Sequence, residues 1–201
     1  MESLLTLGDR RIFLVETGPP AVYYLADRAL DGVLINAPRF SESLWAQLSE
    51  QARPRYLFLP SHRGACDLAL WRQAGVTVLA SQEEAAGIPD VDIAFDSQQK
   101  LSRTIDFLPL AGRTRGTCGL RLKNLPGVLF MGPALRPGPS GWPELQAEPD
   151  DYSYEARLMG IFALQDIAFQ YLFTDHFVPG HTQFGPGARE ALRAHLDALL
   201  A

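Results

Sequence analysis

Short apolar runs that stop abruptly at Pro, Gly or His recur along the chain. Three of them lie within residues 56–67, 126–133 and 177–182, and a fourth leads into a turn at residues 110–118. Runs of this kind predict buried strands whose ends leave the core and present a loop. In α/β proteins, several strands that deliver polar residues to one edge build the functional site. The pattern therefore places the candidate chemistry of this chain at strand ends.

The spacing of apolar positions predicts a chain in which strands and helices alternate. Predicted strands lie at residues 11–16, 22–25, 33–35, 56–59, 76–80, 118–122, 128–131 and 177–178, with two or three more between 91 and 110. The first predicted helix begins after Ser41, which serves as its cap, the second begins at Asp67, and the third begins at the capping box from Ser81 to Glu84. A fourth helix is predicted from Asp151 to about Tyr171, and the last one covers residues 188–200. Residues 136–143, rich in Pro and Gly, form a connection or a lid. This pattern alone predicts a mixed α/β fold.

Composition indicates a globular protein with one domain over residues 1–201. Hydrophobic residues make up 47% of the chain, which is enough for a sizeable core. The formal net charge is −5 and no basic block offsets it, so we expect no nucleic-acid partner. The oligomeric state leaves no mark on the sequence.

The expected lack of a targeting signal and the use of cysteine favour the cytoplasm. The first residues lack a basic start and a long apolar core, so no signal peptide is expected. The most apolar long stretch, residues 158–173, contains Gln165 and Asp166 and is too short and too polar to span a membrane. Cys66 and Cys118 give no disulfide framework, which fits a reducing compartment.

Four strand-end segments follow one another in a distinctive order and spacing. They are residues 60–65 (Pro-Ser-His-Arg-Gly-Ala), 111–116 (Ala-Gly-Arg-Thr-Arg-Gly), 132–133 (Gly-Pro) and 179–181 (Pro-Gly-His), and a strand at residues 32–36 precedes them. This series resembles the metallo-β-lactamase superfamily of metal-dependent hydrolases, over nearly the whole chain. The resemblance implies a four-layer αββα sandwich as the fold.

Most metal-ligand positions of that family are replaced in this chain. The family's first motif is His-x-His-x-Asp-His, and only His62 is kept there. Arg113 stands in the turn where the family has Pro-Gly-His-Thr-x-Gly, and Pro133 stands where a strand of the family ends in Gly-Asp. His181, after Pro-Gly, keeps the last ligand. The framework therefore matches, while the residues of the usual metal centre are mostly absent.

These replacements argue against the usual pair of metal ions. A zinc ion takes about three or four protein ligands, and in the family pattern His62 would serve one ion and His181 the other. Arg113 stays protonated, so it cannot coordinate a cation and repels a nearby one. We therefore expect no metal cofactor. Zinc or another divalent metal is the alternative, with His62 and His181 as ligands.

The resemblance implies a ligand-binding cleft with His62, Arg113 and His181 meeting at one edge of the sandwich. The candidate cleft residues are His62, Arg63, Asp67, Arg113, Thr114 and His181. Simpler roles stay open for several of them. His62 could cap a strand end, Asp67 could serve as a helix N-cap, and Arg113 could form a solvated surface salt bridge. The other histidines, His176 and His195, are expected to be structural or exposed to solvent.

Two classes of function follow. The first is a non-catalytic or binding relative in which Arg113, with Arg63 or Arg115, holds a small anion, because arginine binds carboxylate or phosphate through two parallel hydrogen bonds. The second is a metal-dependent hydrolase of an ester, thioester or amide with a reduced or rearranged metal site, in which Asp67 or Cys66 could join the two histidines. The missing ligands favour the first class. A third reading is an interaction protein with a vestigial cleft.

Overall fold

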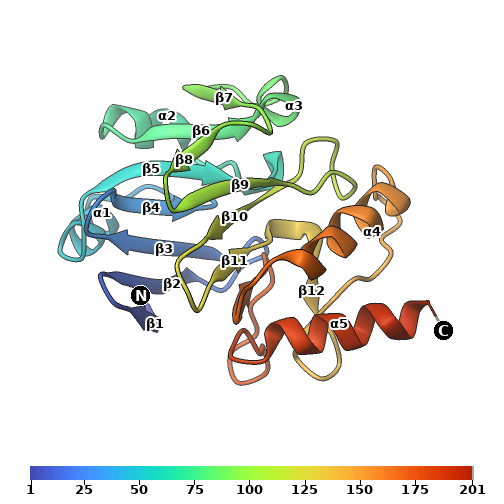
Figure 1. Cartoon of the computed structure of the whole chain (residues 1–201). Helices are drawn as coiled ribbons and strands as arrows, with labels where there is room; N and C mark the ends of the chain where they lie inside the picture. Colours follow the sequence, from blue (N-terminus) through green and yellow to red (C-terminus); the bar gives the residue numbers. More distant parts are fainter. Residues whose placement is uncertain (201) are drawn as a thin grey trace. The chain divides into compact units, whose positions relative to one another are not determined.

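The structure is a computed structural model that describes residues 1–200, and the chain divides into two compact units. The first unit is Met1–Phe95 and the second is Asp96–Ala201. Each unit contains one main sheet with helices on it (Figure 1). The mixed α/β class predicted from the sequence is confirmed. One domain over residues 1–201 stays a prediction.

A seven-stranded sheet forms the first unit, with its strands in sequence order from β1 to β7. The strands are β1 (Glu2–Leu7), β2 (Arg10–Glu16), β3 (Val22–Asp27), β4 (Asp31–Ile35), β5 (Pro54–Leu59), β6 (Thr77–Ser81) and β7 (Ile93–Phe95). Pairs from β1 to β4 are antiparallel, and pairs from β4 to β7 are parallel. Parallel neighbours need crossover connections. These contain α1 (Glu42–Ser49), the 3-10 turn η1 (His62–Gly64) with α2 (Leu68–Gln73), and α3 (Gln82–Ala85).

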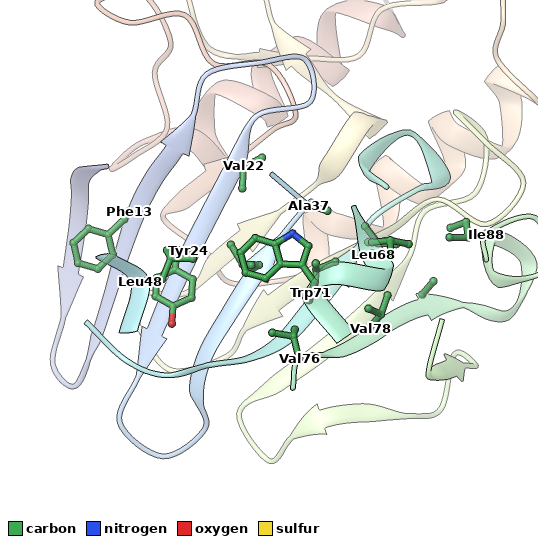
Figure 2. Packing of buried hydrophobic residues seen from close by; sticks show 14 of the residues in the cluster. Phe13, Val22, Tyr24, Ala37, Leu48, Leu68, Trp71, Val76, Val78 and Ile88 are labelled. Carbon is green, nitrogen blue, oxygen red and sulfur yellow. The ribbon is translucent and has the colours of Figure 1, made fainter. Parts of the chain in front are cut away.

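The core of the first unit is built around Trp71. Its side chain is fully buried among aliphatic residues of the sheet and of α1, and Figure 2 shows the indole in the middle of this cluster. The indole N–H donates to the carbonyl oxygen of Pro38 at 2.9 Å, so its one polar group is satisfied. Phe40 packs edge-on against the indole at a centroid distance of 5.0 Å. Trp71 thereby fixes α2, which follows the first candidate site segment.

A five-stranded sheet forms the second unit, in the order β14-β11-β10-β9-β8. Its strands are β8 (Lys100–Ser102), β9 (Ile105–Pro109), β10 (Cys118–Leu122), β11 (Val128–Phe130) and β14 (Tyr171–Phe173). The outermost pair β11 and β14 is parallel, and the other neighbours are antiparallel. A short hairpin joins β12 (Arg136–Pro137) to β13 (Pro143–Glu144), after the 3-10 turn η2 (Gly132–Ala134).

Helices pack on this second sheet through a separate apolar core. They are α4 (Tyr154–Phe162), the 3-10 turn η3 (Ala163–Asp166) and α5 (Ala188–Leu199). Buried residues such as Ile161, Leu192 and Leu196 contact Leu129 and Leu172 of the strands in one cluster. Ser153 caps α4 through a hydrogen bond from the N–H of Ala156 at 3.1 Å. The start of α4 is therefore well defined, and it lies close to the turn that carries Arg113.

Three predicted elements are wrong. The helix expected from Asp151 to about Tyr171 starts after Ser153 and ends by Asp166, because the apolar run that follows forms β14. Residues 177–178 are not a strand. The segment 136–143, expected as a loop, contains the strands of the β12–β13 hairpin. In the first unit, the edge strand β1 lacks a clear apolar run and was not predicted.

Gly64 provides a test of the packing at the first site segment. A Cβ added there would collide with the side-chain amide of Asn36, which is fully buried and donates to the carbonyl oxygen of Ala21 at 2.8 Å. We expect Gly64→Ala to lower the unfolding free energy by about 1–3 kcal/mol, the usual range for overpacking. Urea denaturation measures it. Gly87→Ala is the matched control, since its Cβ would meet only an atom at 3.8 Å, and equal losses in both variants would refute this account.

Candidate functional site

His62 is fixed by a buried carboxylate. Its ring Nδ1 lies 2.7 Å from Oε2 of Glu84, and its backbone N–H donates to the same oxygen at 2.6 Å. An ionised carboxylate can only accept, so Nδ1 carries the proton of this contact and Nε2 is the ring nitrogen left for other partners. The side chain of Glu84 is 3% exposed, whereas that of His62 is 54% exposed. The pair therefore presents one oriented imidazole nitrogen to solvent.

Sequence reasoning missed the role of Glu84. This residue is the last one of the capping box predicted at residues 81–84, and Ser81 caps α3 by accepting from the N–H of Glu84 at 3.4 Å. The carboxylate of Glu84, however, binds His62 from a position 22 residues further along the chain. The only sequence signal was an acidic residue at the start of a short helix, which a capping box already explained.

Arg63 and Asp67 lie in the same segment as His62. Arg63 is exposed and belongs to η1. Asp67 stands at the N-cap position of α2, as predicted, but its side chain makes no capping hydrogen bond. Its backbone is left-handed, with φ of 47°, and its carboxylate instead accepts from the N–H of Phe40 at 3.1 Å. Burial, followed by the charge of Asp67, raises the pKa of Cys66, so this thiol is a weak ligand and a weak nucleophile at neutral pH.

The turn that carries Arg113 is closed by its own hydrogen bonds. The N–H of Leu110 donates to the carbonyl oxygen of Thr117 at 2.9 Å. The N–H of Thr114 donates to Oγ1 of Thr117 at 2.8 Å, and the two hydroxyl oxygens lie 2.6 Å apart. Thr114 is 6% exposed. Its hydroxyl therefore holds the shape of the turn and, through it, the position of Arg113.

Arg113 is paired with two carboxylates. Its Nη1 lies 2.6 Å from Oδ1 of Asp150 and 3.2 Å from Oδ1 of Asp151. The guanidinium side chain is only 11% exposed, and Asp150 is 60% exposed. The alternative of a solvated surface salt bridge therefore describes the Asp150 end of this contact, but not the mostly buried arginine.

Arg157 continues this cluster into the interior. Its side chain is 1% exposed, and its Nη1 donates to both carboxylate oxygens of Asp151 at 2.8 Å. Its Nε donates to the carbonyl oxygen of Ala134 at 2.8 Å, in η2. Burial lowers the pKa of Arg157, and the ion pair with Asp151 opposes that effect. We call Arg113, Asp150, Asp151 and Arg157 the arginine–carboxylate network.

Gly112 allows the network to form. Its φ is 136°, and a Cβ added there would collide with the backbone and the Cβ of Arg157. Its carbonyl oxygen accepts from the N–H of Ser153, the cap of α4, at 3.0 Å. The first turn of α4 is thus held directly against the turn that carries Arg113. Only glycine tolerates both this backbone conformation and this close approach.

His181 links its segment to the β12–β13 hairpin. It is exposed, and its Nε2 lies 3.1 Å from the carbonyl oxygen of Gly138. A carbonyl only accepts, so Nε2 carries a proton and donates it to this contact. A second bond between the same segments runs from the N–H of Gln183 to the carbonyl oxygen of Gly141 at 2.9 Å. These contacts fasten residues 138–141, the tip that was expected to be a connection or a lid.

His176, which was expected to be structural or exposed, lies in a charged environment. Its Nδ1 is buried and has no hydrogen-bond partner within residues 1–200. Burial lowers the pKa of His176, and the charges of Arg136 and Arg113 lower it further, while Glu148 opposes them. Arg136 forms an ion pair with Glu148 and donates from Nε to Oε1 of Gln146 at 2.6 Å. His176 is therefore a neutral imidazole beside the arginine–carboxylate network.

The fold is shared with solved structures. The sequence matches no protein-family model and no curated protein significantly. The structure is similar to a metallo-β-lactamase from Staphylococcus aureus subsp. aureus COL (TM-score 0.72, 11% identity, 95% of this chain and 63% of that one). It is also similar to a metallo-β-lactamase family protein from Thermus thermophilus, with a TM-score of 0.64 and 17% identity over 94% of this chain and 80% of that one. The mono-zinc form of the Pseudomonas aeruginosa enzyme FIM-1 matches with a TM-score of 0.66 and 14% identity over 100% of this chain and 96% of that one. The chain has the metallo-β-lactamase fold.

The residues present do not fit the paired metal centre that the metallo-β-lactamase fold implies. Gly64 carries no ligand and has no room for one beside Asn36. Arg113 and Asp151 satisfy each other's charge, and Pro133 lies in η2 without a donor atom. Within residues 1–200, no three His, Cys, Asp or Glu side chains form a group that could hold a metal ion. The expected absence of a metal cofactor stays a prediction.

The predicted cleft residues belong to both units. His62, Arg63 and Asp67 lie in the first unit, whereas Arg113, Thr114 and His181 lie in the second. Their meeting at one edge stays a prediction. The structure brings His62 to Glu84, Arg113 to Asp150 and Asp151, and His181 to Gly138.

Cys66 and Cys118 form no disulfide, and none of the helices within residues 1–200 is long and apolar enough to cross a membrane.

The arginine–carboxylate network can be tested by removing its central charge. Asp151→Asn leaves the guanidinium of Arg157 buried without a carboxylate, so we expect a loss of about 3–5 kcal/mol in unfolding free energy. Asp150→Asn removes an exposed partner and should cost no more than about 1 kcal/mol. Chemical denaturation of the two variants gives the comparison. Similar losses in both would show that Asp151 has no special part in the fold.

The pH dependence of stability tests the environment of His176. Because its pKa is lowered in the folded protein, the unfolded chain binds a proton first as the pH falls through about 6.5. Stability is then lost from that pH downward, by at most about 1.4 kcal/mol per pH unit. Between pH 7 and pH 5, the unfolding free energy of His176→Gln should therefore fall less steeply than that of the wild type. Parallel slopes would contradict this.

Proposed function

We propose that this protein uses the metallo-β-lactamase fold to bind a small anion and does not assemble a dinuclear metal centre for hydrolysis. The observation that carries the proposal is the state of Arg113, which stands at a metal-ligand turn and is mostly buried in a network of arginines and carboxylates. The two unbridged cysteines are compatible with the cytoplasm, where we propose that the protein acts.

The chemistry of the network supports this proposal. A guanidinium stays protonated, cannot coordinate a cation and repels a divalent ion placed near it. Asp151, the buried carboxylate that contacts Arg113, also accepts hydrogen bonds from Arg157 through both of its oxygens. The turn therefore holds a permanent cation where the family has an imidazole, and an oxyanion is the kind of ligand that an arginine at such a turn recognises.

Metal content is the direct test. We expect the protein, purified without chelator, to contain far less than two equivalents of zinc, iron or manganese per chain by elemental analysis. Arg113→His should not raise this content, because Gly64 and Pro133 still provide no ligand. A value close to two equivalents in the wild type would overturn the proposal.

A metal-dependent hydrolase of an ester, thioester or amide, with a reduced or rearranged site, is the second candidate. One observation favours it. The Nδ1–H of His62 donates to Glu84, and metal-ligating histidines commonly donate their other ring N–H to a carboxylate in this way. The similar FIM-1 structure is of a mono-zinc form. His62 would hold the ion through Nε2, and His181 is the other expected ligand.

Zinc titration separates the two candidates. Our proposal predicts that wild type, His62→Ala and Glu84→Gln all show the same weak response in calorimetry. If the wild type takes up one equivalent tightly, and both variants lose it while Glu83→Gln does not, the hydrolase with a reduced site is the better reading. Glu83 is the matched control because it is the exposed neighbour of Glu84 on α3.

A further inference from the structure

The segment from Glu148 to Asp151 supplies three carboxylates to three arginines of the second unit. Glu148 pairs with Arg136, Asp150 with Arg113, and Asp151 with both Arg113 and Arg157. The three arginines come from distant points of the sequence. The acidic segment therefore occupies all three arginines at once, in contacts that an anionic ligand could also make.

Burial separates these four pairs into two that share the buried Asp151, with Arg157 and with Arg113, and two outer ones, Asp150 with Arg113 and Glu148 with Arg136. Asp151 is 5% and Arg157 is 1% exposed, and their bond is part of the interior. In the outer pairs, Asp150 is 60% and Arg136 is 38% exposed, whereas their partners Arg113 and Glu148 are 11% and 18% exposed. Exposed ion pairs contribute little net free energy and exchange readily with other ions. Asp150 can therefore leave Arg113, and Arg136 can accept another anion, while the buried Asp151–Arg157 pair stays in place.

His176 adds an independent observation. Its buried Nδ1 has no hydrogen-bond partner within residues 1–200, although buried polar atoms almost always have one. The backbone next to His176 is held at η2, two residues before Arg136, because the N–H of Asp175 donates to the carbonyl oxygen of Gly132 at 3.0 Å. The charges of Arg136, Glu148 and Arg113, three of the four members of the two outer pairs, act on His176. An unsatisfied imidazole nitrogen beside two arginines points to a missing hydrogen-bonding ligand. A neutral imidazole carries one N–H, which can donate a hydrogen bond to an oxyanion.

We propose that Arg113, Arg136 and His176 form an oxyanion site, and that the chain's own Asp150 and Glu148 occupy its two arginines when no ligand is bound. This inference rests on the proposed anion-binding function and names its site. The ligand is a phosphate or carboxylate group, for which arginine provides paired, charge-assisted hydrogen bonds. The acidic segment acts as a competitor within the same chain and lowers the apparent affinity for that ligand.

The test is calorimetric titration at low ionic strength with inorganic phosphate and, separately, with succinate. Asp150→Asn removes the exposed competitor and keeps its size, so we expect phosphate or succinate to bind at least about threefold more tightly than to wild type. Asp197→Asn is the control, because this exposed carboxylate of α5 lies in the same unit and its loss changes the net charge equally. Arg136→Gln should weaken binding, and the imidazole NMR signals of His176 should shift on titration of Asp150→Asn.

The outcomes are distinct. Equal affinities in Asp150→Asn and Asp197→Asn, or binding that Arg136→Gln leaves unchanged, would overturn the site while anion binding elsewhere on the protein survives. No binding of either anion to any variant would overturn both the site and the anion-binding function. A preference for phosphate over succinate, or the reverse, identifies the source of the oxyanion. Near-stoichiometric paired metal would refute the proposed function by a separate readout.

Discussion

The buried ion pair between Asp151 and Arg157 is the contact on which the candidate site of the second unit depends. It joins the segment before α4 to the helix itself, and Arg157 extends it to η2 through Ala134. Replacing such a pair with apolar residues is often neutral, but breaking it by removing one partner is costly. The pair therefore fixes the conformation of the segment more than it adds net stability. Arg113 is positioned at its outer end, and so is the exposed carboxylate of Asp150.

The two histidines expected as metal ligands are each fixed by one ring contact. His62 keeps a carboxylate partner, and His181 keeps a backbone carbonyl, so each has one committed and one available ring nitrogen. Around them the donors differ from those of a metal site. A glycine packed against Asn36, an ion-paired arginine and a proline stand at the other positions.

Much of the fold could be predicted because strands, caps and turns have local signals. Ser41 and Ser153 cap helices by short-range bonds, although Asp151 rather than Ser153 was taken as the start of α4. The candidate site was harder, since its contacts join distant residues. Glu84 meets His62 across 22 residues, and Asp151 meets Arg113 across 38. Periodicity cannot reveal such pairs. Arg157 stands one helical turn before Ile161, and its burial on the same face of α4 is a fact that only the structure provides.

Thermal unfolding with and without divalent metal tests most directly whether the arginine–carboxylate network, rather than an ion, holds this site together. A ligand that binds only the folded state at about one hundred times its Kd adds about 2.7 kcal/mol of stability, which raises the Tm by several degrees in a chain of this size. We predict that the Tm of the purified protein is the same in EDTA, in buffer alone and in excess zinc. A Tm that falls in EDTA and is restored by zinc would contradict the account.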